Sequence, residues 1–185
     1  MKIFSILSIV LALTFIGACK KKKKEEVTNP PVVNEEELIT TFRITFTDAG
    51  GVQPTVIAQF VDLDGAGGNA PTIFDTIRLQ ANTTYNASIT LLNESVNPAE
   101  DLTVEVQEED QDHLFCFSPT GSLNLGITRT DSDGTYEVGL LSSWAAQAIS
   151  TGETTITLKH QPGVKNGQCD PGETDIELTF HTIIE

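Results

Sequence analysis

Oxygen-bearing side chains gather in two glycine-containing stretches of the chain. They are Asp62, Asp64 and Asn69 in "DLDGAGGN", and Asn166, Asp170, Glu173 and Asp175 in "NGQCDPGETD". Carboxylate and amide oxygens on a flexible loop suit Ca²⁺. Neither stretch carries the full EF-hand pattern, and Asp and Gly are also common in ordinary turns. The two stretches are therefore candidate Ca²⁺ sites, with plain turns as the alternative.

A second kind of metal chemistry is suggested by "EEDQDH". Glu109 and His113 lie four residues apart and share one face if residues 107–113 form a helical turn. An imidazole beside carboxylates can hold Zn²⁺ or another transition metal, and His160 or His181 could join from another strand. The alternative is a solvated acidic rim with a locally hydrogen-bonded histidine.

The amino-terminal segment has the features of a bacterial export signal. Lys2 precedes an almost wholly apolar run at residues 3–16, which is shorter than the roughly 20 residues that a membrane span needs. Gly17 and Ala18 before Cys19 resemble the lipobox of bacterial lipoproteins, in which cleavage leaves the cysteine as an acylated first residue. We expect residues 1–18 to be a lipoprotein signal peptide and Cys19 to carry acyl chains, palmitate included, that anchor the chain to the membrane.

Charge is distributed unevenly behind the lipidation site. Five lysines occupy residues 20–24, and the chain from Glu25 onward holds all 26 acidic residues against five basic ones. Such an acidic body repels nucleic acid and attracts cations. Residues 19–37, rich in Lys, Glu, Pro and Asn, predict a flexible charged linker. A charged run behind the lipid cysteine resembles the export signals of Bacteroidota surface lipoproteins. The cell surface and the periplasmic face of the outer membrane are the two alternative locations.

Two thiols remain once Cys19 is acylated, Cys116 and Cys169. Disulfides persist outside the cytoplasm, so these two cysteines form either a disulfide or a pair of free thiols. The triplet "DTI" resembles the O-glycosylation site of Bacteroidota, with Thr76 as the acceptor, although strand packing explains the same residues.

Apolar and polar residues alternate through most of residues 38–185, as they do in half-buried strands. "TFRITFT" places Phe42, Ile44 and Phe46 on one face. The same reasoning predicts strands at residues 55–62, 72–79, 84–92, 102–107, 113–118, 123–128, 136–141, 154–160 and 175–180. About ten short strands predict one all-β domain over residues 38–185, an antiparallel β-sandwich of immunoglobulin-like or jelly-roll-like type, with a small β-barrel as the alternative.

Three stretches depart from the strand pattern. "NPAED" predicts one helical turn capped by Asn97, and "SSWAAQAIS" predicts a short helix or a crossover, with Trp144 in the core. Asp133-Gly134 predicts a hairpin turn.

The passages "LLNESVNPAEDLTVEVQEEDQDHLFCF", "LKHQPG" and "PGETDIELTF" resemble a family of small Bacteroidota lipoproteins often named "type 1 periplasmic binding fold superfamily protein". The resemblance covers roughly residues 37–184 and implies a lipoprotein of that lineage, with no assigned ligand. The succession of strands favours a sandwich over the two-lobed fold of alternating strands and helices that the name describes.

These features predict a lipid-anchored binding module at the outer membrane that captures a cation or small nutrient beside a transporter. The alternative is a structural or adhesive surface protein without a small ligand. The sequence lacks a Gly-x-Ser-x-Gly elbow, a His-Glu-x-x-His motif and a phosphate-binding glycine loop, so we expect no enzymatic activity.

Overall fold

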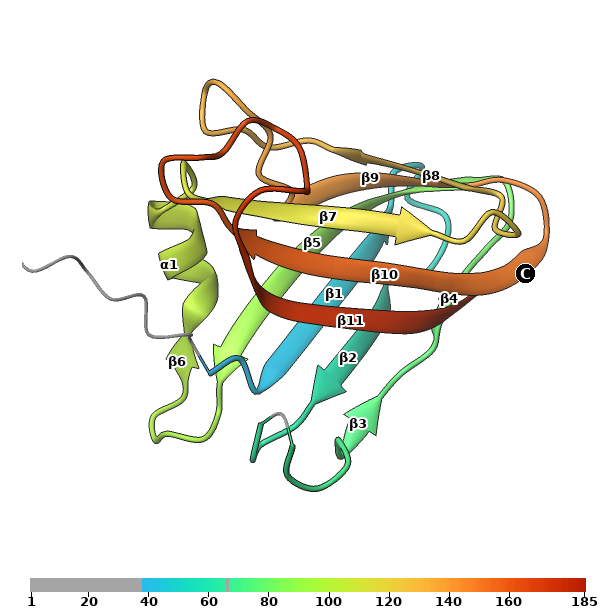
Figure 1. Cartoon of the computed structure of the whole chain (residues 1–185). Coiled ribbons are helices and arrows are strands. Elements are labelled where there is room, and N and C mark those ends of the chain that lie inside the picture. Colours follow the sequence, from blue (N-terminus) through green and yellow to red (C-terminus); the bar gives the residue numbers. More distant parts are fainter. Residues whose placement is uncertain (1–37, 66) are drawn as a thin grey trace, which may run out of the picture. The chain divides into compact units, whose positions relative to one another are not determined.

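Two β-sheets lie face to face in the computed structural model, which describes residues 38–65 and 67–185 (Figure 1). The larger sheet has the strand order β3-β2-β1-β5-β9-β8, with β6 also paired to β5. Its strands are β1 (Thr41–Asp48), β2 (Val56–Val61), β3 (Ile73–Phe74), β5 (Thr83–Asn93), β6 (Glu100–Asp101), β8 (Leu125–Arg129) and β9 (Leu141–Ala146). All of its strand pairs are antiparallel.

The smaller sheet has the order β4-β11-β10-β7. It consists of β4 (Ile77–Leu79), β7 (His113–Pro119), β10 (Ser150–His160) and β11 (Glu173–Ile184), and one helix, α1 (Leu102–Glu108), precedes β7. Among the described strand pairs of this sheet, only β4–β11 is parallel. The predicted β-sandwich is therefore confirmed, and the barrel alternative is wrong because the described strands form two separate sheets.

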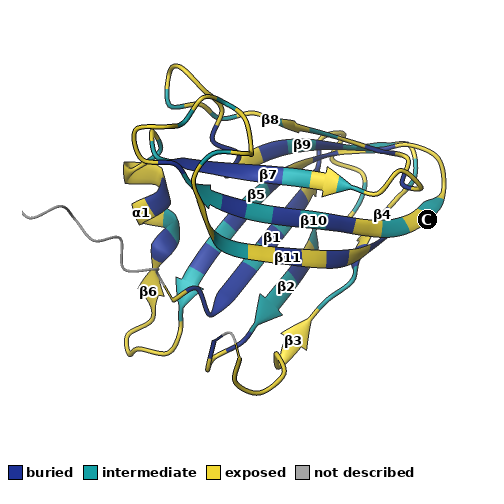
Figure 2. Ribbon diagram, viewed as in Figure 1, coloured by how far each residue is buried: buried dark blue, intermediate teal, exposed yellow. Residues whose placement is uncertain are grey.

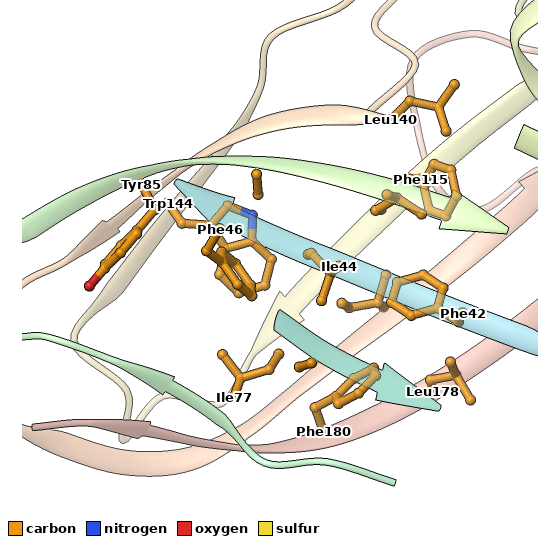
Figure 3. Close-up of a cluster of buried hydrophobic side chains, with 14 of the residues drawn as sticks. Phe42, Ile44, Phe46, Ile77, Tyr85, Phe115, Leu140, Trp144, Leu178 and Phe180 are labelled. Atoms are coloured by element: carbon orange, nitrogen blue, oxygen red, sulfur yellow. The ribbon is translucent and has the colours of Figure 1, made fainter. Parts of the chain in front are cut away.

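The core lies between the inner faces of the two sheets, and along β1, β5, β9 and β10 the buried residues alternate with more exposed ones (Figure 2). Phe42, Ile44 and Phe46 project from β1 into this layer (Figure 3). The rings of Phe42 and Phe180 meet across it with centroids 5.7 Å apart. Trp144 is fully buried, as predicted, with its ring 4.9 Å from that of Phe46. Burying each such side chain contributes roughly 1.5–3 kcal/mol.

The predicted strand at residues 102–107 is wrong, because these residues form α1. Leu102 and Val106 are buried while Val104 is half exposed, which is the i, i+4 pattern of an amphipathic helix. The side chain of Asp101 caps the helix by accepting a hydrogen bond from the backbone N–H of Thr103 at 3.0 Å. The cap is therefore Asp101, and the helical turn predicted behind Asn97 is also wrong.

The predicted helix or crossover at residues 142–150 is a strand, β9, followed by the start of β10. Ser142, Trp144 and Ala146 are buried in alternation. Residues 136–140 are not a strand, but a bridge between Ser132 and Glu137 closes the predicted turn around Asp133-Gly134.

The predicted strand at residues 72–79 is divided between the two sheets, since β3 pairs with β2 and β4 pairs with β11. Asp75 stands at the break, where its Oδ2 accepts a hydrogen bond from the backbone N–H of Gln59 at 3.0 Å. Thr76, the predicted glycosylation acceptor, follows it and is half-buried.

The predicted signal peptide, Cys19 and the linker to residue 37 lie outside the described residues. Within the described ranges, no helix is long and apolar enough to span a membrane.

Candidate functional site

The end of α1, the start of β7 and the end of β10 meet at one end of the sandwich (Figure 1). Glu109 is the C-cap residue that follows α1, and its backbone N–H donates to the carbonyl of Glu105 at 2.8 Å. His113 opens β7 and faces His160, the last residue of β10, as its direct partner in the antiparallel ladder. Three elements therefore bring together side chains that are up to 51 positions apart in the sequence.

The two imidazole rings are stacked, with centroids 4.8 Å apart and planes at 13°. One ligand atom each from Glu109, His113 and His160 can be chosen so that all three lie within 4.8 Å of one another. His113 is buried, His160 is half-buried and Glu109 is exposed. In the described part of the chain, this is the one cluster of at least three His, Cys, Asp or Glu side chains close enough to share a metal ion.

Hydrogen bonding orients the buried histidine. Nδ1 of His113 lies 3.1 Å from the backbone carbonyl oxygen of Glu109. A proton on Nδ1 donates to this carbonyl and leaves the lone pair on Nε2, which is the arrangement that fixes a ligating histidine in most metal sites. Nε2 in turn lies 3.9 Å from Oδ2 of Asp175, whose side chain is nearly buried. Two of the residues proposed from sequence, His113 and Asp175, are thus neighbours although they were assigned to different sites.

The loop of residues 161–172 continues directly from His160 and is held in a fixed conformation. The Gln161 side chain is fully buried, and its Nε2 donates to the carbonyls of Gln168 at 2.9 Å and Pro171 at 2.8 Å. Gly172 has φ +83°, and a Cβ there would lie 2.1 Å from the carbonyl oxygen of His160. Only glycine fits so close an approach, so the loop packs tightly against the end of β10.

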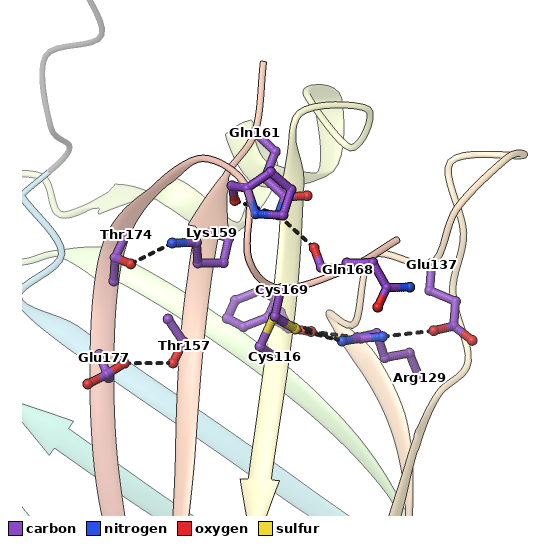
Figure 4. Close-up of a disulfide and its surroundings, with 12 residues drawn as sticks. Cys116, Arg129, Glu137, Thr157, Lys159, Gln161, Gln168, Cys169, Thr174 and Glu177 are labelled. Carbon is purple, nitrogen blue, oxygen red and sulfur yellow. Dashed lines mark hydrogen bonds and ion pairs between the residues drawn. A yellow bond between two sulfur atoms is a disulfide. The ribbon is translucent and has the colours of Figure 1, made fainter. Parts of the chain in front are cut away.

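A disulfide joins Cys116 on β7 to Cys169 in this loop (Figure 4). Of the two alternatives that the sequence left open, the disulfide is therefore the one present. The guanidinium of Arg129 lies over it, with Nη2 3.4 Å from Sγ of Cys169. Arg129 also donates to the carbonyl of Phe115 and pairs with Glu137 at 2.9 Å.

A buried ion pair, which sequence reasoning missed, ties the same loop to the turn before β9. Nζ of Lys165 lies 2.8 Å from Oδ2 of Asp133, and both side chains are less than 5% exposed. Nζ also donates to the carbonyl of Asp110 at 2.6 Å. Burial acts to raise the pKa of Asp133, but the Lys165 hydrogen bond and the backbone N–H groups of Tyr136 and Thr135 outweigh it and lower the pKa to about 2. Lys165 is one of five basic residues after Glu25, and that rarity was the only signal in the sequence.

The first candidate Ca²⁺ loop is closed by its own hydrogen bonds. Oδ2 of Asp64 accepts from the backbone N–H of Asn69 at 2.9 Å and from its Nδ2 at 2.6 Å, and these bonds lower the pKa of Asp64. The Asp62 side chain, unlike that of Asp64, is buried. Burial together with the Asp64 carboxyl raises the pKa of Asp62.

The residues of the second candidate loop point to different places. Oδ1 of Asn166 accepts from the backbone N–H of Gln168 within a local turn, at 2.9 Å. Asp170 is exposed, and Glu173 lies opposite His160 at the start of β11. His181 lies near the other end of β10, where its Nε2 is 3.5 Å from Oγ1 of Thr151, so it is not part of the cluster.

Comparisons with models of known protein families, with curated proteins and with solved structures returned no match. The resemblance to a Bacteroidota lipoprotein family stays a prediction.

Proposed function

We propose that this protein is a lipid-anchored binding module that captures a divalent transition-metal cation, Zn²⁺ above all, at Glu109, His113 and His160. The observation that carries the proposal is the approach of one ligand atom from each side chain to within 4.8 Å of the others. Two imidazoles and a carboxylate form a donor set that suits Zn²⁺ better than Ca²⁺ or Mg²⁺, which prefer oxygen.

Burial and access differ across the cluster in a way that supports reversible capture. His113 is buried and oriented by a backbone carbonyl, whereas Glu109 is exposed. Three protein ligands leave a fourth position of a tetrahedral ion open to water or to an exchanging ligand, unlike closed structural sites with four protein ligands. The strongly acidic domain also raises the local concentration of cations. Delivery to an outer-membrane transporter is part of the proposal.

A structural or adhesive role is the second candidate. It is favoured by large apolar side chains exposed on β2 and β3, namely Ile57, Ile73 and Phe74, which are 39–51% exposed. Such side chains can contact another macromolecule. If the protein acts only in this way, neither its stability nor its binding to a partner should depend on a metal ion.

Zinc titration of the purified full-length chain tests the first candidate. We expect one Zn²⁺ per chain, and a loss of affinity of at least about 100-fold in His113→Ala and in His160→Ala, because even outer-shell changes cost 10–100-fold. His181→Ala is the matched control, since His181 is exposed and lies outside the cluster, and it should bind like the parent. Equal affinity in all four chains, or no stoichiometric zinc, would exclude the site.

The anchor is tested separately by Cys19→Ser. Without the cysteine thiol, the chain should no longer incorporate labelled palmitate, because no acyl chain can be attached at residue 19. Undiminished incorporation of palmitate in Cys19→Ser would contradict lipid anchoring at this residue.

A further inference from the structure

A cavity of about 280 Å³ opens beside the cluster of Glu109, His113 and His160, between the end of β2 and the first part of β11. β11 pairs with β4 only at Thr182–Ile184, so among the described strands its first part has a partner, β10, on one side alone. The cavity lies along this open edge. It is lined by residues 174–178 of β11 together with Ile39, Phe60, Asp62 and Gly65.

The lining combines apolar side chains with acidic ones. Ile39, Phe60 and Leu178 offer aliphatic and aromatic surface, whereas Asp62 and Asp175 contribute carboxylates. Among the described residues that line the cavity there is no lysine, arginine or histidine. This composition disfavours an anion and leaves a cationic ligand with an apolar part as the complementary chemistry.

One carboxylate oxygen in this lining accepts no hydrogen bond from the described residues. Asp62 is 7% exposed, and the buried oxygen is its Oδ1. Buried acceptors are nearly always hydrogen-bonded in folded proteins, so this oxygen points to a donor that a ligand would bring. Burial and, after it, the neighbouring Asp64 carboxyl raise the pKa of Asp62, which is the direction that a bound cation would reverse.

We propose that the cavity binds a small organic cation, whose ammonium group donates to Oδ1 of Asp62 while a short aliphatic part packs against Ile39, Phe60 and Leu178. An ammonium brings N–H donors and a compact positive charge. A hard metal ion fits less well because much of the lining is apolar. In the described residues, moreover, Asp62 belongs to no group of three carboxylates close enough to share an ion.

This ligand goes beyond the proposed metal function and depends on different residues. Asp62 lies on the loop after β2, outside the Glu109, His113 and His160 cluster. Asp175 connects the cavity with the histidine cluster. It lines the cavity, and its Oδ2 lies 3.9 Å from Nε2 of His113. Changes at Asp62 and at the histidines therefore separate the two proposals.

The test is a titration of the full-length chain with n-butylammonium, in which binding is monitored through the NMR chemical shifts of the backbone amides. Neutral n-butanol is the matched control probe. We expect saturable binding of n-butylammonium alone, with shifts concentrated at residues 60–65 and 174–178. Asp62→Asn keeps the side-chain shape and should weaken binding at least about tenfold, because a charge-assisted hydrogen bond is lost. Glu153→Gln removes the same charge from an exposed position on β10 and should leave binding unchanged.

Four outcomes would overturn the proposal. They are no saturable binding, equal binding of n-butanol, equal losses in Asp62→Asn and Glu153→Gln, and saturable Ca²⁺ binding at these residues without n-butylammonium binding. If Asp62→Asn fails to fold, the location of the amide shifts in the unmodified chain still decides the question. Zinc affinity should be unchanged in a folded Asp62→Asn chain, so a failed metal proposal and a failed cavity proposal give different results.

Discussion

Replacing Asp133 with asparagine is expected to lower the free energy of unfolding by about 3–5 kcal/mol at neutral pH, because the change leaves the buried ammonium of Lys165 without its counter-charge. Asparagine has nearly the same shape, and its Oδ1 can still accept from the backbone N–H groups of Thr135 and Tyr136, as Asp133 does at 2.7 Å. Urea unfolding of the two chains at pH 7 measures the difference.

The same pair predicts a pH dependence. The pKa of Asp133 falls from 3.8 to about 2 on folding, so its contribution is fully present above pH 4 and is lost as the pH falls toward 2. The difference in unfolding free energy between the parent and Asp133→Asn should therefore be largest above pH 4 and shrink below it.

Glu137→Gln is the control for Asp133→Asn, because Glu137 pairs with Arg129 but its side chain is 53% exposed. Exposed pairs contribute at most about 1 kcal/mol. Equal losses in the two variants, or a difference that stays constant from pH 7 to pH 2, would contradict the role assigned to the buried pair.

Removal of the disulfide by Cys116→Ala with Cys169→Ala is the second large effect. The bridge closes a loop with a sequence separation of 53, which restricts the unfolded chain and stabilises the fold by about 4 kcal/mol in the chain-entropy model. That is a large share of the roughly 5–15 kcal/mol that stabilises a typical domain. Urea unfolding of the double variant measures the loss.

A reducing agent provides the internal control. It should lower the stability of the parent to the level of the double variant and leave the variant itself unchanged. A reduced parent as stable as the oxidised one would show that the cross-link contributes little.

Asp133→Asn should lower the free energy of unfolding by less in the double variant than in the parent, because the loop that carries Lys165 is then less constrained.

The sequence pattern predicted the sheets well where one face of a strand is buried. Phe42, Ile44 and Phe46 are all fully buried on β1, because period-two alternation reports directly on a strand with one face in the core. β9 was missed since its inward residues include the small Ser142 and Ala146, whose burial does not stand out by hydropathy.

The segment at residues 102–107 was misread for a different reason. Leu102, Val104 and Val106 alternate, but Leu102 and Val106 also satisfy the helical i, i+4 spacing, so both periods fit a short apolar run. In the structure the segment is a helix, capped by Asp101, in which Leu102 and Val106 are the buried residues. Periodicity alone cannot make that decision over six residues.

The candidate metal site was only partly predictable. Glu109 and His113 are close in sequence, so their association could be proposed from spacing. His160 joins them through the ladder between β7 and β10, and no sequence rule distinguished it from His181. The ion pair of Lys165 with Asp133 and the buried Asp62 carboxylate likewise depend on loops meeting in space, which sequence spacing does not specify.

X-ray absorption at the zinc edge, recorded on the full-length chain loaded with one equivalent of Zn²⁺, tests the proposed capture site most directly. We expect two imidazole nitrogens at about 2.0–2.1 Å from the zinc, with oxygen as the remaining ligands, and the loss of one imidazole in His160→Ala. A shell of oxygen alone, or one unchanged in His160→Ala, would contradict zinc binding at Glu109, His113 and His160.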